Sequence, residues 1–128
     1  MDSIKFIGEV QSTLKEIEEC PLQEDEGAPS VTIRIYDAYQ TALSGLAAGS
    51  SIILFTWLHR AKRDTLTTKP RNNPKAGTLG IFATRSPDRP NPIGMHQVKL
   101  IKIEGCLITV SQLEVVDGTP LIDIKPVI

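Results

Sequence analysis

The feature that most constrains the fold is a series of short segments in which apolar and polar residues alternate. Residues 31–36, Val-Thr-Ile-Arg-Ile-Tyr, have this alternation, which is typical of a half-buried β-strand. Residues 51–59 are rich in β-branched and aromatic side chains and indicate a buried central strand. Residues 98–103 and 107–113 flank a glycine-bearing turn and predict a hairpin. A last short strand is expected at residues 121–124.

Helical patterning is confined to one short stretch. Residues 39–48 are rich in alanine and leucine, with Asp37 as the expected N-terminal cap. A length of 128 residues favours a single domain over residues 1–128. Five to seven short strands with one brief helix predict a mainly β fold, a small single-sheeted antiparallel β-barrel.

The charge of the chain is unevenly distributed. The net charge is −1, which excludes a molecule that is strongly basic throughout. Residues 1–30 nevertheless carry a net charge of −6, and residues 59–89 carry +6. A basic stretch of this density attracts polyanions such as RNA. The alternative is a solvated surface loop.

Composition also bears on the compartment. The longest apolar run, residues 52–55, is far shorter than the ~18 residues of a spanning helix, and the N-terminus lacks the pattern of a secretory signal. Cys20 and Cys106 have no paired spacing, and no histidine–cysteine cluster has the spacing of metal ligands. We therefore expect a cytoplasmic protein with no membrane partner and no metal.

Residues 79–94 form the most informative segment. Pro87, Pro90 and Pro92 fall within six residues, and each proline restricts its own backbone and that of the residue before it. Arg85 and Arg89 lie on this stiff loop, where a pre-ordered guanidinium offers a forked donor to a carboxylate or phosphate. The alternative is an inert proline-rich turn.

Two motifs resemble a known family. Residues 82–94, Phe-Ala-Thr-Arg-Ser-Pro-Asp-Arg-Pro-Asn-Pro-Ile-Gly, resemble the signature of the TsaA-like or TrmO family. Residues 117–126, Asp-Gly-Thr-Pro-Leu-Ile-Asp-Ile-Lys-Pro, match its second motif, and the resemblance covers nearly the whole chain. It implies a dimeric β-barrel enzyme with its cofactor near the subunit interface. Such an enzyme uses S-adenosyl-L-methionine to methylate N6 of threonylcarbamoyladenosine beside the tRNA anticodon.

The resemblance also implies a cofactor site. No glycine-rich turn of the doubly wound nucleotide-binding type is present, so loops must hold the cofactor. Arg85 suits the methionine carboxylate, and acidic residues suit hydroxyls or the ammonium group. The implied cofactor residues are Gln23, Glu24, Asp25, His59, Arg60, Arg85, Met95, Asp117, Gly118, Thr119 and Pro120.

The methyl acceptor requires a base. N6 of a carbamoylated adenosine is amide-like and a poor nucleophile until its proton leaves. His59, Asp117 and Asp123 are candidates by residue type, and we favour Asp117 because turns at a barrel rim stay accessible. The alternatives are a plain turn for Asp117, an ion pair with Lys125 for Asp123, and a structural contact with a backbone carbonyl for His59.

Lys69, Arg71 and Arg89 are expected to contact the phosphates of the tRNA anticodon stem-loop. Trp57 is the one aromatic residue expected near the basic stretch, which predicts little base stacking. Trp57 itself is expected in the core and His96 on the surface. Met95 has core filling as its alternative role.

Two other functions fit the same residues. One is a methyltransferase that uses S-adenosyl-L-methionine on a small metabolite. The other is a barrel that binds RNA or the cofactor without catalysis.

Overall fold

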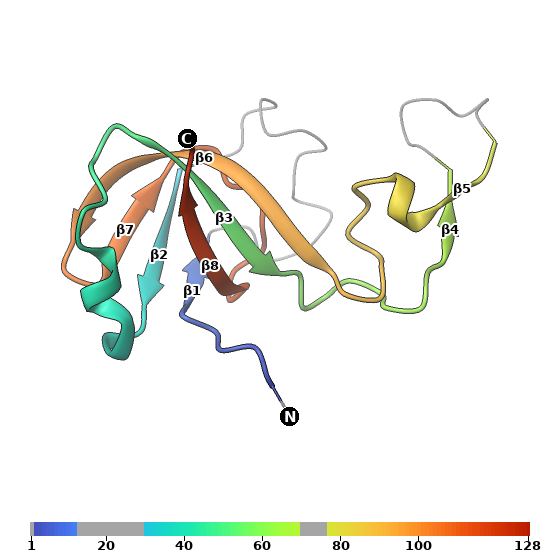
Figure 1. Cartoon of the computed structure of the whole chain (residues 1–128), viewed down its shortest axis with the longest axis horizontal. Coiled ribbons are helices and arrows are strands. Elements are labelled where there is room, and N and C mark those ends of the chain that lie inside the picture. Colours follow the sequence, from blue (N-terminus) through green and yellow to red (C-terminus); the bar gives the residue numbers. More distant parts are fainter. Residues whose placement is uncertain (1, 13–29, 70–76) are drawn as a thin grey trace.

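The main body of the protein is a six-stranded antiparallel sheet (Figure 1). The computed structural model describes residues 2–12, 30–69 and 77–128. Hydrogen-bonded neighbours follow the order β1-β2-β7-β6-β3-β8, and β8 pairs back with β1, so the sheet closes into a barrel. The prediction of a mainly β, antiparallel fold is confirmed. The six strands are β1 (Gly8–Gln11), β2 (Val31–Ile35), β3 (Ser51–Trp57), β6 (Ile93–Glu104), β7 (Leu107–Val110) and β8 (Pro120–Pro126).

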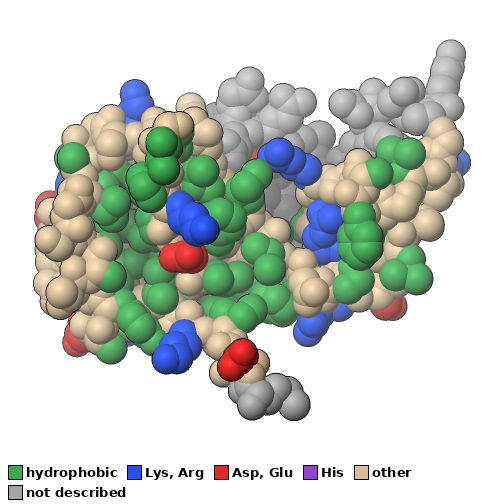
Figure 2. Space-filling view, viewed as in Figure 1, with side chains coloured by type: hydrophobic (Ala, Val, Ile, Leu, Met, Phe, Trp, Pro, Cys, Tyr) green, Lys and Arg blue, Asp and Glu red, His purple; other side chains and the backbone are tan. Residues whose placement is uncertain are grey.

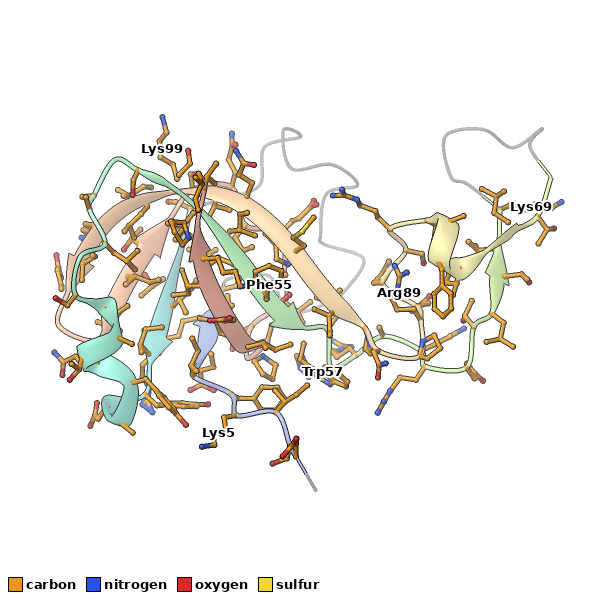
Figure 3. All side chains as sticks on the ribbon, viewed as in Figure 1. Lys5, Phe55, Trp57, Lys69, Arg89 and Lys99 are labelled. Carbon is orange, nitrogen blue, oxygen red and sulfur yellow. The ribbon has the colours of Figure 1, made fainter. Side chains whose placement is uncertain are left out.

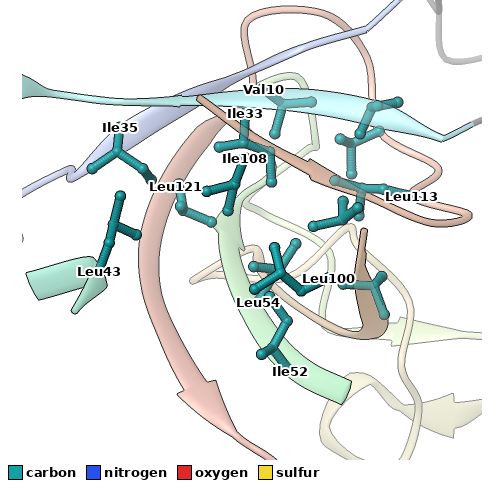
Figure 4. Close-up of a cluster of buried hydrophobic side chains, with 14 residues drawn as sticks. Val10, Ile33, Ile35, Leu43, Ile52, Leu54, Leu100, Ile108, Leu113 and Leu121 are labelled. Carbon is teal, nitrogen blue, oxygen red and sulfur yellow. The ribbon is translucent and has the colours of Figure 1, made fainter. Parts of the chain in front are cut away.

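Aliphatic side chains from every strand of the barrel fill its interior (Figure 4). In β3, Ile52, Leu54 and Thr56 are buried while the residues between them are half-buried, which is the period of two expected of a strand. Ile33, Ile108 and Leu121 are completely buried. This continuous core fixes the six strands relative to one another and therefore fixes the loops at both barrel ends.

Several strand boundaries differ from the prediction. β3 ends at Trp57 rather than at residue 59, and β7 ends at Val110 rather than at residue 113. β6 begins at Ile93, five residues before the predicted start. β1 was not predicted, because its four residues are too few to display a clear alternation.

The predicted short helix is confirmed, although its bounds differ from the predicted residues 39–48. Residues Asp37–Leu43 form a 3₁₀ helix, η2. Asp37 lies within its first turn, and Tyr36 occupies the N-cap without a side-chain hydrogen bond. Leu43 is the buried residue of η2 and packs onto the core, which holds this short segment in place. Within the described ranges, no helix is long and apolar enough to cross a membrane.

A lobe that contains residues 58–69 and 77–92 projects from one side of the barrel (Figure 1). Its regular structure is small: β4 (Thr67–Thr68) pairs with β5 (Leu79–Gly80), and η3 (Ile81–Ala83) follows directly. Ile81 is buried, whereas most of its neighbours in the lobe are exposed. The lobe therefore depends on hydrogen bonds between its loops more than on a core of its own.

Candidate functional site

Three chain segments that carry the family-like motifs meet at one end of the barrel. Trp57, the last residue of β3, pairs with Ile93 at the start of β6. On its other side β3 pairs with the start of β8, where Thr56 faces Leu121. The turn after β3, the proline loop before β6 and the Asp-Gly turn before β8 therefore open at the same end. Figure 3 shows Trp57 where the barrel meets the lobe.

His59 and Arg60 occupy the two central positions of a tight turn after β3. The Ala61 amide donates to the Leu58 carbonyl at 2.9 Å, which closes the turn. The Leu58 amide donates to the Pro92 carbonyl at 2.8 Å, which ties the turn to the proline loop. Both His59 and Arg60 are exposed. In the described part of the chain, no backbone carbonyl binds the His59 ring, so that structural alternative lacks support.

Arg89 holds the proline loop together from within (Figure 3). Its guanidinium donates to the carbonyl oxygens of Thr84 at 3.0 Å, Ser86 at 3.2 Å and Ile81 at 3.2 Å. These bonds link the loop to η3, and the side chain is only partly exposed. Arg89 is thus a bracing residue, and its predicted contact with RNA phosphate stays a prediction.

The proline loop is also tied to the segment that follows β3. The Lys62 amide donates to the Asp88 carboxylate at 2.9 Å, and the Arg63 side chain donates to the Pro90 carbonyl at 2.8 Å. The Arg63 guanidinium lies 5.0 Å from the centre of the Trp57 ring, a cation–π distance. The prediction that Trp57 is a core residue is wrong, because its ring is half-buried under Arg63 at the junction with the lobe.

Arg85 lies on the same braced loop but points to solvent. Its side chain is exposed, and no hydrogen bond or ion pair within the described residues holds its guanidinium. The backbone around it is ordered by side-chain turns: the Ser86 amide donates to Thr84 Oγ1 at 3.2 Å, and the Asp88 amide donates to Ser86 Oγ at 3.3 Å. The chain therefore presents a forked cation on a fixed backbone.

The Asp-Gly turn before β8 is fastened to the end of β1. Gly118 adopts a φ of 82°, a conformation that favours glycine, and its amide donates to the Val10 carbonyl at 2.8 Å. An Asp117 carboxylate oxygen accepts from the Ser12 amide at 2.9 Å. Thr119 is buried and its hydroxyl donates to the Val116 carbonyl at 2.7 Å, while Pro120 begins β8. Asp117 is thus both a turn residue and an exposed, positioned carboxylate.

Met95, Phe55 and Asp123 form a row across the outer face of the barrel. Phe55 pairs with Met95 in β6 and with Asp123 in β8. Met95 is 50% exposed, so its alternative role as a core residue is wrong. Asp123 accepts a hydrogen bond from the Ile124 amide at 2.9 Å, and these described residues show no ion pair between Asp123 and Lys125. Asp123 therefore lies on the barrel wall beside Phe55, in the same row as Met95.

His96 is buried, and its predicted surface position is wrong. Its Nε2 is hydrogen-bonded to Thr56 Oγ1 at 2.9 Å inside the barrel, and burial lowers its pKa to about 4. Gly94 lies against this pair: a Cβ there would come within 2.5 Å of Thr56 Oγ1 and 2.6 Å of His96 Nε2. Glycine is therefore required where β6 leaves the proline loop.

The remaining predicted residues are placed as follows. Lys69 is exposed at the outer edge of the lobe, after β4 (Figure 3). Gln23, Glu24, Asp25 and Arg71 lie outside the described residues.

Phe82 is a feature that the sequence analysis missed. It is the middle residue of η3 and is 83% exposed, the largest exposure of any aromatic side chain described. The pattern around it resembles a buried segment, because Ile81 and Phe82 are adjacent apolar residues. Only the 3₁₀ turn, which sends Ile81 inward, leaves Phe82 outside.

The fold and the rim define a class of protein: a small closed β-barrel whose candidate site consists of loops at one barrel end, beside a cationic lobe. Residues 9–128 match the model of the family described as tRNA-methyltransferase O N-terminal domain, and the chain belongs to that family.

Relatives support the assignment. An S-adenosyl-L-methionine-binding protein of Archaeoglobus fulgidus is 36% identical over 122 residues, which cover 95% of this chain and 86% of the relative. A probable S-adenosyl-L-methionine-binding protein of Rhizobium radiobacter, VirR, is 37% identical over 97% of this chain and 70% of its own length. The crystal structure of TrmO from Pseudomonas aeruginosa superposes with a TM-score of 0.78 at 32% identity. That match covers all of this chain and 56% of the TrmO chain.

Proposed function

We propose that this protein is an S-adenosyl-L-methionine-dependent methyltransferase that methylates N6 of threonylcarbamoyladenosine next to the tRNA anticodon. The family assignment supports the reaction class, and the names of the relatives support the cofactor. The single observation that carries the proposal is the meeting of both family-like motifs at one barrel end, since a shared ligand requires them to be close.

The residues at this rim fit the chemistry of the cofactor. Arg85, exposed and pre-ordered, suits the carboxylate of the methionine portion. The turn at Asp117–Pro120 offers a carboxylate and backbone groups to the adenosine portion, and the His59–Arg60 turn forms the facing wall. The proposed cofactor-binding set also includes Met95, on the barrel wall opposite Phe55, and Gln23, Glu24 and Asp25, which lie outside the described residues.

The cofactor supplies an electrophilic methyl group on a sulfonium. The S–CH₃ bond breaks as the N6–CH₃ bond forms, the thioether product keeps the sulfur electron pair, and the N6 proton goes to a base. Asp117 and His59 are the proposed bases, because both are exposed at the rim. Most of the acceleration then comes from fixed positioning of the two reactants, an effect of ~7–11 kcal/mol in favourable cases.

A polyanionic substrate is supported by the lobe. The described residues of the lobe carry six cationic and two acidic side chains, while the whole chain has a net charge of −1. Lys69, Arg71 and Arg89 are the proposed phosphate contacts. Figure 2 shows lysine and arginine side chains on the lobe and beside it.

We also propose a cytoplasmic homodimer. On the outer face of β3 and β6, Ile93 is 44% and Met95 50% exposed, and they pair with the half-buried Trp57 and Phe55. A second copy of this chain is the proposed occupant of that face, since exposed apolar patches of this kind mark interfaces. Sedimentation of the purified protein would measure the mass directly.

The experiment measures cofactor binding and methyl transfer in turn. Saturating S-adenosyl-L-methionine at about 100 times its Kd should stabilise the protein by about 2.7 kcal/mol. Incubation with tRNA that contains threonylcarbamoyladenosine and with the deuterated-methyl cofactor should then yield a labelled nucleoside in mass spectrometry. tRNA without the threonylcarbamoyl group is the matched control and should stay unlabelled.

Each negative outcome points to a different alternative. Cofactor binding without tRNA labelling would overturn the tRNA assignment and leave a methyltransferase of a small metabolite. RNA binding without any thermal shift by the cofactor or its demethylated product would overturn the enzyme assignment and leave a non-catalytic RNA-binding barrel.

A further inference from the structure

Phe82 is so exposed that its aromatic side chain contributes little to the stability of the isolated chain. The ring is 83% exposed, whereas Ile81 beside it is 2% exposed. Burying an aromatic side chain stabilises a protein substantially, so a monomer gains from turning such a ring inward. Phe82 therefore needs an explanation outside the isolated chain.

The backbone at Phe82 is held in place from both sides. The Ile81 amide donates to the Leu66 carbonyl at 2.9 Å, across from β4. The Ile81 carbonyl accepts from Thr84 Oγ1 at 2.9 Å, from the Thr84 amide at 3.1 Å and from Arg89 Nη2 at 3.2 Å. Turning Phe82 inward would break these bonds and expose Ile81. The ring is thus pre-organised in its outward position, which reduces the entropy lost when a ligand covers it.

The surroundings of Phe82 are cationic. Arg85 follows three residues later and is exposed, and Lys69 is exposed at the edge of the same lobe. The described lobe has a net charge of +4. Lysine is depleted in protein–protein interfaces, whereas an aromatic face among cations is the usual platform for single-stranded nucleic acid. These observations favour RNA over a second protein chain.

We propose that Phe82 is a stacking platform for an unpaired nucleobase of the RNA substrate, on the same cationic lobe as Lys69, a proposed phosphate contact. This inference rests on the proposed function, because it takes RNA as the substrate. It differs from the phosphate contacts in kind: base stacking on an aromatic ring is not ionic, so its contribution persists when salt screens the phosphates.

The test compares three substitutions at one position in binding to a fluorescent anticodon stem-loop RNA. Phe82→Ala should raise the Kd about 5- to 150-fold, the range that stacking of one base corresponds to. Phe82→Leu, which keeps apolar bulk without an aromatic face, should lose affinity similarly. Phe82→Trp, which keeps an aromatic face, should bind the RNA as tightly as the wild type. The slope of log Kd against log salt concentration should be the same for all four proteins.

Leu66→Ser is the matched control, because Leu66 is also apolar, 68% exposed and in the same lobe. It should leave the Kd for RNA unchanged. All variants should keep the wild-type melting temperature and the thermal shift with S-adenosyl-L-methionine, since neither residue is buried.

Four outcomes would overturn the inference. The first three are an unchanged Kd in Phe82→Ala, wild-type affinity in Phe82→Leu, and a salt slope that falls together with the affinity. A lower sedimenting mass of free Phe82→Ala would show that the ring contacts a second copy instead. Failure of the wild-type protein to bind RNA would instead overturn the proposed substrate, and this inference with it.

Discussion

Arg85 and Arg89 lie four residues apart in one loop, yet the structure gives their guanidinium groups opposite surroundings. Arg89 donates to three carbonyl oxygens of its own loop and η3. Arg85 is exposed and has no such bonds among the described residues. The Arg89 guanidinium uses three of its hydrogen bonds to hold the loop, whereas all the donors of the Arg85 guanidinium are available to a ligand. The two substitutions should therefore separate folding from binding.

Arg89→Ala should lower the free energy of unfolding by about 1–3 kcal/mol, because it leaves loop carbonyls without their donor. Arg85→Ala should change it by less than about 0.5 kcal/mol, as is usual at exposed positions. Arg85→Ala should instead raise the Kd for S-adenosyl-L-methionine about 10-fold or more, the equivalent of one charged hydrogen bond. Urea unfolding and calorimetric titration measure the two quantities. Loss of stability in Arg85→Ala without loss of affinity would contradict its assignment to the cofactor.

His96 should make stability depend on pH in the acidic range. Its pKa is lowered to about 4 by burial, against 6.5 in the unfolded chain. The unfolded state therefore binds the proton first as pH falls, and stability present above pH 6.5 is lost between pH 6.5 and about 4. At pH 5 this one group should cost about 2 kcal/mol relative to pH 7. Urea unfolding at the two pH values measures the loss.

His96→Gln is the control for that measurement, because an amide can bond to Thr56 Oγ1 without titrating. The variant should lose about 2 kcal/mol less than the wild type between pH 7 and pH 5, whatever its stability at pH 7. An equal loss in both proteins would show that other groups cause the acid sensitivity.

At the scale of elements, strands whose alternation is local were predictable from the sequence. Residues 31–36 and 51–59 contain enough alternating side chains to reveal β2 and β3. The start of β6 was missed for the same reason. Its buried positions are Gly94, His96, Val98 and Leu100, and the first two are not hydrophobic residues, so the sequence there shows no alternation of apolar and polar side chains. Because His96 was expected at the beginning of the strand, it was assigned to the surface.

The candidate site was predictable in outline for a different reason. Its two motifs are specific as sequences, and the register of β3 with β6 and β8 brings them to one end. The roles of Arg89 and Phe82 were not predictable, because each depends on hydrogen bonds to carbonyls in η3, a turn that has no sequence period of its own. The short helix was predictable because alanine and leucine favour helices, but this general preference did not give its 3₁₀ form or its bounds, Asp37–Leu43.

At the scale of the whole molecule, the positive charge is concentrated on the lobe that projects from the barrel. The described residues of the lobe, 58–69 and 77–92, carry a net charge of +4, and the other described residues together carry −2. In Figure 1 this basic segment is the projecting lobe and the barrel lies to its side. An approaching polyanion is therefore attracted to the lobe and repelled by the remainder, which orients it toward the rim between them.

This distribution of charge predicts that the position of a charged residue affects tRNA binding more than the net charge of the protein does. Lys69→Glu, in the lobe, should weaken binding of tRNA and reduce the slope of log Kd against log salt concentration by about 1, because one phosphate contact is lost. Lys99→Glu makes the same change in net charge on β6 at the far side of the barrel (Figure 3) and should leave that slope unchanged. Neither variant should alter the thermal shift with S-adenosyl-L-methionine, because both side chains are exposed away from the rim turns. Equal effects of the two substitutions on tRNA binding would mean that net charge alone attracts the RNA and that the lobe does not orient it.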